Sequence, residues 1–174
     1  KEVIYAYGME LLISDVLNTI IVLLIALFSH TLPAVVVFIA VFMGLRQFVG
    51  GFHANSHLSC MFTLVMVMMV FSYGICNVSG HITPIFSISF IMIALPIILC
   101  IAPVPHPNKP MSEEKSVKLR KRSCILAVTL SVVTIALLVF QYQKLSLYVS
   151  SGMLLSAIMA LLGHFLNRGD NSKR

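Results

Sequence analysis

Charged residues are scarce in this sequence. Asp, Glu, Lys and Arg make up only 10% of its 174 residues, and the mean hydropathy is +0.98. A soluble domain carries about a quarter charged residues. A chain this apolar cannot cover its own surface with polar groups, so the scarcity excludes an ordinary soluble enzyme. It predicts a single integral membrane domain over residues 1–174, with the lipid bilayer as part of its solvent.

Tryptophan is absent, and the four cysteines form no C-x-x-C pair. The missing tryptophan means that any interfacial anchors must come from tyrosine and charged side chains. The cysteine spacing argues against a disulfide framework, which is typical of small secreted chains.

Long apolar runs are abundant. A membrane-spanning helix needs about 20 mostly apolar residues. Continuous runs of this length favour helices over the shorter, alternating strands of a β-barrel. The sequence therefore predicts an all-α polytopic membrane protein with about six transmembrane helices, at Met9–Phe28, Leu32–Val49, Cys60–Val78, Pro84–Ala102, Cys124–Tyr142 and Leu147–Leu166. We expect Pro96 to kink the fourth run.

The basic residues predict the orientation of these helices. With six spans both termini lie on one side, and Lys144 is the only basic residue assigned to the other side. Because Lys and Arg concentrate in cytoplasmic loops, we expect both termini to be cytoplasmic. The formal net charge is +6, and we expect no nucleic-acid partner. The predicted cytoplasmic residues are Lys1, Arg46, Lys109, Lys115, Lys118, Arg120, Lys121, Arg122, Arg168, Lys173 and Arg174.

The longest connection is the loop Pro103–Arg122. Its first part, APVPHPNKP, is rich in proline and should be extended. Its second part, MSEEKSVKLRKR, should form a short helix that runs into the fifth span, with Ser112 as the cap. Two roles are open for this loop. In the first, it only sets the topology and contacts anionic lipid headgroups. In the second, it docks an acidic peptide through Lys118, Arg120, Lys121 and Arg122.

The densest polar stretch is Arg46–Cys60, with the sequence RQFVGGFHANSHLSC. A cysteine peptidase needs a thiolate and a basic partner for it. Cys60 has two histidines close in sequence, His53 and His57. If it lies in the first turn of the third span, the helix dipole would stabilise its thiolate. The residues that could cap that helix are Asn55, Ser56 and Ser59.

Two histidines compete for the role of base. His57 and Cys60 are three residues apart and would touch on a regular helix. His53 and Cys60 are seven apart, which is about 10 Å of helical rise and too far for a hydrogen bond. His53 could reach Cys60 only if the backbone folds back, which Gly50 and Gly51 would permit. The spacing mildly favours His57.

Other interpretations of these residues stay open. A buried cysteine can be an inert small hydrophobe. His53, His57 and Cys60 have a spacing that could bind zinc, although no fourth ligand or HExxH motif is evident. Asp15 within the first span could pair with Arg46, orient His53 as a third catalytic member, or be hydrated at the interface. Charges inside the spans would also suit a small transporter or peptide exporter.

The pattern R-x-x-x-G-G-x-H-A, followed by a cysteine seven residues after the histidine, resembles the AgrB family of membrane cysteine endopeptidases. Tyr7-Gly8 and the APVPHPNKP segment add to the resemblance. The family acts in bacterial quorum sensing, where it cleaves the propeptide AgrD. The resemblance implies a plasma-membrane location and an active site that faces the cytoplasm.

The resemblance also implies roles for individual residues. Cys60 would be the nucleophile and His53, rather than His57, the general base. Arg46, Gly50 and Gly51 match positions associated with activity in the family, and Lys109 lies where relatives carry functional lysines. A cysteine or serine of the peptide would then close a thiolactone or lactone ring. The resemblance implies a homodimer, and no cofactor is expected.

Overall fold

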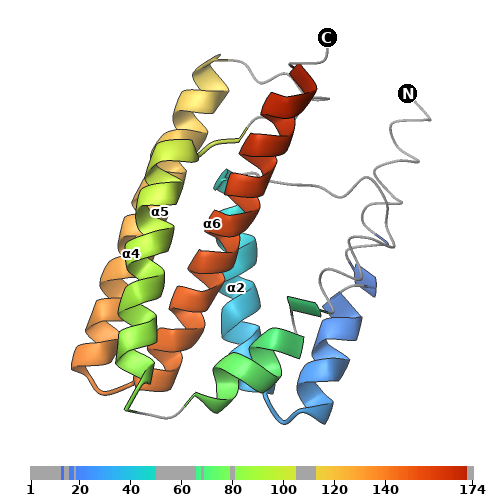
Figure 1. Ribbon diagram of the computed structural model, residues 1–174, viewed down its shortest axis with the longest axis vertical. Coiled ribbons are helices and arrows are strands. Elements are labelled where there is room, and N and C mark those ends of the chain that lie inside the picture. Colours follow the sequence, from blue (N-terminus) through green and yellow to red (C-terminus); the bar gives the residue numbers. More distant parts are fainter. Residues whose placement is uncertain are drawn as a thin grey trace. The chain divides into compact units, whose positions relative to one another are not determined.

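The computed structural model describes residues 13, 16–17, 19–49, 66–67, 69–78, 81–104 and 113–171. Every element that it describes is a helix, as the sequence predicts. Four helices are long and apolar enough to cross a membrane, and they coincide with four of the six predicted runs (Figure 1). These are α2 (Leu32–Val49), α4 (Thr83–Ile101), α5 (Glu113–Val139) and α6 (Gln143–Asn171).

The other two predicted spans are described only in part. In the first, the helix Thr19–Phe28 is apolar but shorter than a span. In the third, a π-helical segment η1 (Val70–Gly74) is followed by a 3₁₀ segment η2 (Ile75–Asn77). Most of the remaining residues of both runs lie outside the described part of the chain. Six spans and their orientation therefore stay predictions.

The chain divides into two compact units. One comprises residues 1–35 and 54–77, and the other comprises residues 36–53 and 78–174. In the first unit, the described helix Thr19–Phe28 turns directly into the start of α2. The second unit contains the rest of α2 together with α4, α5 and α6, and it includes Arg46 and the basic residues at the start of α5.

Both short helix–helix turns in the described chain end in the same way. His30 has a positive φ of 54° and follows the helix Thr19–Phe28, and the Thr31 N–H donates to the carbonyl oxygen of Ala26 at 2.9 Å. The equivalent bond after Gln141, whose φ is 65°, measures 2.8 Å. This is the Schellman arrangement, in which a left-handed residue stops a helix and satisfies its last carbonyl groups. In both places it lets the next helix begin directly after the turn.

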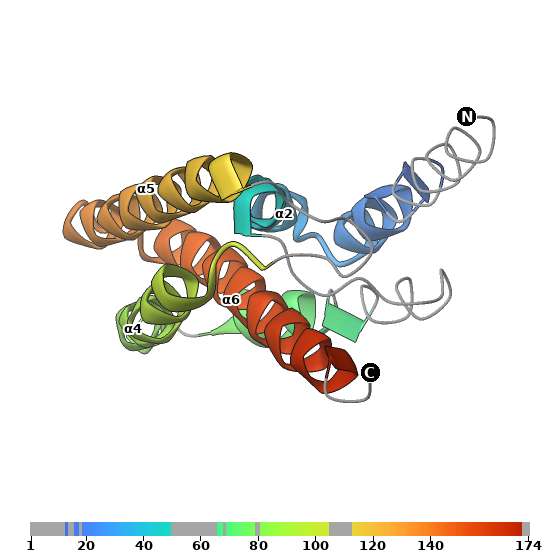
Figure 2. The ribbon, with the colours of Figure 1, turned by 90° about the horizontal axis from the view of Figure 1, so that it is seen from above.

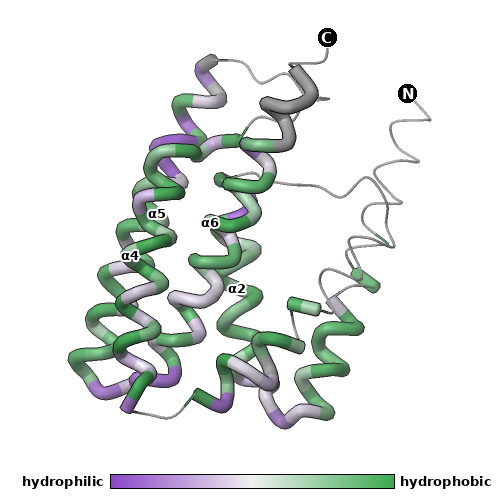
Figure 3. Tube along the Cα trace, in the orientation of Figure 1, coloured by the Kyte–Doolittle hydropathy of each residue, from purple (hydrophilic) through white to green (hydrophobic). Residues whose placement is uncertain are grey.

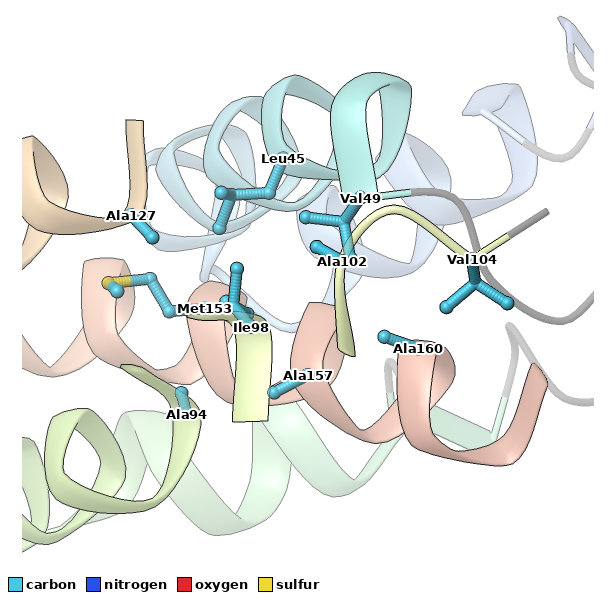
Figure 4. Packing of buried hydrophobic residues seen from close by; sticks show 10 residues of the cluster. All are labelled: Leu45, Val49, Ala94, Ile98, Ala102, Val104, Ala127, Met153, Ala157 and Ala160. Atoms are coloured by element: carbon cyan, nitrogen blue, oxygen red, sulfur yellow. The ribbon is translucent and has the colours of Figure 1, made fainter. Parts of the chain in front are cut away.

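The core of the second unit lies between α2, α4, α5 and α6 (Figures 2 and 4). Half of its buried residues are alanines, and small side chains allow apolar helices to approach closely where lipid gives no hydrophobic drive for association. The buried cluster consists of Leu45, Val49, Ala94, Ile98, Ala102, Val104, Ala127, Met153, Ala157 and Ala160.

The tightest packing is between α2 and α6. A Cβ atom added at Gly152 would lie 3.0 Å from the carbonyl oxygen of Phe38 and 3.1 Å from the side chain of Val41. One turn further along α6, the Ser156 hydroxyl is 3.0 Å from the Gly152 carbonyl and 3.4 Å from that of Phe42. Only glycine allows α2 to lie this close, so the contact fixes the position of α2 on α6.

Two local predictions concern α4 and α5. Pro96 lies inside α4, which continues through it to Ile101. The segment predicted to be a short helix before the fifth span is helical from Glu113 onward, and it runs without a break into the apolar part of α5. Residues 113–122 of the predicted loop are therefore the first turns of a transmembrane-length helix.

Candidate functional site

The structure describes only part of the predicted site. Arg46 lies in the last turn of α2, and four predicted docking cations lie in the first turns of α5: Lys118, Arg120, Lys121 and Arg122. The other predicted site residues lie outside the described part of the chain: Cys60, His53, His57, Gly50, Gly51, Asn55, Asp15 and Lys109.

Arg46 is half-buried and lies against an aromatic side chain one turn earlier. Its guanidinium carbon is 5.6 Å from the centre of the Phe42 ring. This distance permits a cation–π interaction, in which the negative face of the ring attracts the charge. Phe42 is itself buried and stacks on Phe38, with ring centres 6.4 Å apart. The Arg46 guanidinium is thereby held against the side of α2.

The end of α2 is tied to the chain that follows α4. The Val104 N–H donates to the carbonyl oxygen of Val49 at 2.9 Å, a normal hydrogen-bond length. Both residues are buried in the same cluster (Figure 4). The last carbonyl groups of a helix have no partner within the helix, so Val104 satisfies a group that would otherwise be buried without one.

This bond joins the starting points of the two stretches that the sequence singles out. The Gly50–Cys60 stretch follows Val49 directly in sequence, and Val104 lies near the start of the proline-rich segment APVPHPNKP, five residues before Lys109. The two stretches are about 50 residues apart in sequence, yet they start from one buried hydrogen bond. We use the name Val49 end for the end of the second unit that contains the Val49–Val104 hydrogen bond.

Sequence reasoning missed Val104. Nothing in its own residue type indicates a partner, and the pairing depends on how α2 and α4 pack. The Arg46–Phe42 contact could be predicted from the sequence, because residues four apart share a helix face.

The docking cations lie on an exposed, polar part of α5, which is visible as hydrophilic colour in the upper part of this helix in Figure 3. Lys118 forms an ion pair with Glu114, one turn earlier, and both side chains are more than two-thirds exposed. The hydroxyl of buried Ser123 donates to the Arg120 carbonyl oxygen at 2.9 Å.

Other chemistry is limited within the described residues. Three cysteines there form no disulfide bond, namely Cys76, Cys100 and Cys124. No group of three His, Cys, Asp or Glu side chains in the described ranges is arranged to hold a metal ion. The zinc interpretation concerns residues outside these ranges.

A family model described as accessory gene regulator B matches residues 1–160, which is most of the chain. The chain belongs to the AgrB family. A putative AgrB-like protein from Clostridium beijerinckii is 24% identical over 116 residues, which cover 65% of this chain and 56% of that protein. The chain therefore spans little more than half the length of this relative. No solved structure matches the chain.

Family membership indicates a membrane protein. It agrees with the four helices of transmembrane length and apolar composition. The matched region includes both the Arg46–Cys60 stretch and the basic start of α5.

Proposed function

We propose that this AgrB-family chain is a multi-pass membrane cysteine endopeptidase. It cleaves an AgrD-like propeptide on the cytoplasmic side, retains the N-terminal part as an acyl-enzyme, and helps to close a cyclic thiolactone or lactone signal. The observation that carries the proposal is the family match over residues 1–160, with the R-x-x-x-G-G-x-H-A and cysteine pattern inside it.

Cys60 and His53 carry the chemistry in this proposal. The Cys60 thiolate attacks the carbonyl carbon of the scissile peptide bond, and His53 gives its proton to the leaving nitrogen. The C-terminal peptide departs with a free amino group, and a thioester remains on Cys60. Backbone N–H groups at the start of the helix that carries Cys60 would stabilise the oxyanion.

Ring closure follows by acyl transfer. A thiolate of the bound peptide attacks the thioester carbonyl, the Cys60 thiolate leaves, and the new thioester is the ring bond. A serine hydroxyl of the peptide would give a lactone. Forming a thioester from a peptide bond is uphill, so removal of the released C-terminal fragment drives the sequence forward. No cofactor is needed.

The geometry of the Val49 end supports this proposal. A peptidase must hold its nucleophile and its substrate segment in register, and a misplacement of about 1 Å can cost 100-fold in rate. The Val49–Val104 hydrogen bond anchors the last residue of α2, from which the chain continues to His53. In the proposal, a cation of the Pro103–Arg122 segment pairs with an acidic part of the peptide. Two copies form a homodimer, which cross-linking in reconstituted membranes would test.

Single-turnover cleavage of an acidic-tailed AgrD-like propeptide in reconstituted membranes tests the chemistry. We expect Cys60→Ala and His53→Ala to lose about 1,000-fold or more in rate, and mass spectrometry to find the acyl adduct on Cys60. Cys100→Ala and His57→Ala are the matched controls and should remain active. Cleavage by Cys60→Ala would overturn the proposal, and loss only with His57→Ala would reassign the base.

A further inference from the structure

One row of side chains along α5 is buried in the bundle, and an exposed arginine lies at its start. Residues seven apart lie almost on one line along a helix, with a drift of about 20°. Arg120, Ala127 and Thr134 form such a line, and Ala127 and Thr134 are both 0% exposed. Ser123, which also borders this line, is 0% exposed as well. Arg120 therefore leaves α5 on the side that packs against the bundle.

The lysines of the same segment lie on a different side. The line from Lys118 continues through Ile125, Val132 and Val139, which are between 57% and 71% exposed. The line from Lys121 continues through Val128 and Ile135, which are 46% and 53% exposed. Seven residues after Arg122 lies Thr129, which is also exposed. These three cations therefore extend the face of α5 that points away from the bundle.

The length of α5 explains why Arg120 is exposed although its line is buried. α5 has 27 residues and α4 has 19. Ala127 belongs to the core cluster that also contains Val49 and Val104. Arg120 lies two turns, or about 10 Å, nearer the start of α5. The start of α5 extends beyond the last turn of α4 (Figure 1). The Arg120 side chain thus starts from the bundle side of α5, beyond the core at the Val49 end.

We infer that Arg120 is the cation of α5 that binds a carboxylate of the peptide substrate, and that Lys118, Lys121 and Arg122 do not. This inference rests on the proposed function and narrows it. A guanidinium can form two parallel hydrogen bonds to one carboxylate, which gives orientation as well as attraction. Lys118 already pairs with Glu114 on its own helix.

The test compares two peptides and four proteins. The peptides are an AgrD-like propeptide with an acidic C-terminal segment and the same peptide with those acids replaced by Gln and Asn. The proteins are the wild type, Arg120→Gln, Lys121→Gln and Arg122→Gln, each in vesicles of neutral and of anionic lipid. Initial rates of cleavage give KM and kcat for each combination.

We expect Arg120→Gln to raise KM for the acidic peptide by about tenfold, with kcat within about twofold of the wild type. The effect should disappear with the neutralised peptide and should be the same in both kinds of vesicle. Lys121→Gln and Arg122→Gln should stay within about twofold of the wild type. Arg120→Lys should recover part of the affinity, because it restores the charge without the planar fork.

Three results would overturn the inference. Equal losses for all three neutralised cations would indicate general attraction, and an equal loss with both peptides would indicate a structural role for Arg120. An effect confined to anionic vesicles would assign Arg120 to lipid headgroups. Failure of the proposed function looks different, because then the wild type would cleave neither peptide or Cys60→Ala would cleave both.

Discussion

The end of α2 and the start of α5 differ in how the second unit holds them. Helix α2 is held at three points along its length: at Phe38 and Val41 by Gly152 of α6, at Phe42 by the Ser156 hydroxyl, and at Val49 by the Val104 N–H. The first turns of α5 extend beyond the core and carry exposed charges. One segment leads into the predicted catalytic stretch, and the other presents cations.

Buried contacts hold α2 in place, whereas the start of α5 is exposed and charged. Buried contacts at α2 each involve about 1–3 kcal/mol when disrupted, whereas an exposed ion pair on α5 contributes about 0–1 kcal/mol. Changes at α2 should therefore alter both stability and rate. Changes at the start of α5 should alter substrate binding and leave stability nearly unchanged.

The largest effect is expected for Gly152→Val. The added side chain would meet the Phe38 carbonyl and Val41, so α2 must move away from α6. We expect the free energy of unfolding to fall by about 1–3 kcal/mol and propeptide cleavage to fall with it. Gly44→Val is the matched control, because a Cβ atom at Gly44 meets nothing within 4 Å. Equal melting temperatures for the two variants would contradict the tight α2–α6 contact.

A somewhat smaller effect is expected for Val104→Pro. Proline keeps apolar volume but has no N–H, so the buried Val49 carbonyl loses its partner at a cost of about 1–3 kcal/mol. Val104→Ala keeps the N–H and loses volume instead. If the hydrogen bond positions the catalytic stretch, kcat should fall more in the proline variant than its loss of thermal stability explains. A larger fall in kcat for the alanine variant would assign the role to packing.

Phe42→Leu should have a moderate effect when compared with Phe38→Leu. Both phenylalanines are buried on α2 and stack on each other, but only Phe42 lies under the Arg46 guanidinium. The two variants lose similar packing, so the difference between them should be the cation–π interaction, about 0.5–1 kcal/mol. Thermal unfolding in detergent measures it. The interaction is unimportant if the two melting temperatures agree.

The smallest effect is expected for Glu114→Gln. The ion pair with Lys118 is exposed on both sides, so its loss should change the free energy of unfolding by no more than about 0.5 kcal/mol. The change should vanish at high salt because salt screens exposed charges. A large loss at high salt would show that the start of α5 is held more firmly than its exposure indicates.

Much of the fold could be predicted from apolar length. The run Leu32–Val49 coincides with α2. The run Pro84–Ala102 lies within one residue of α4, and the runs Cys124–Tyr142 and Leu147–Leu166 overlap most of α5 and α6. The helical start of α5 was also predictable. These features are local, because a helix satisfies its own backbone hydrogen bonds wherever its side chains tolerate lipid.

The chemistry of the site could be predicted only as a set of residue types. The pattern around His53 and Cys60 indicates a cysteine peptidase, and its spacing alone does not choose between His53 and His57. That assignment depends on the backbone path between them and stays a prediction.

Three features were decided by the packing of helices. In the sequence, nothing distinguishes Gly152 from the other glycines or Val104 from the other valines, and the basic residues of α5 form a single cluster. The close approach of α2 to α6 makes the glycine necessary, α2 supplies the acceptor for Val104, and burial of the Ala127 line separates Arg120 from its neighbours. Helical periodicity states which residues share a face, but only contact with other helices determines which face is buried.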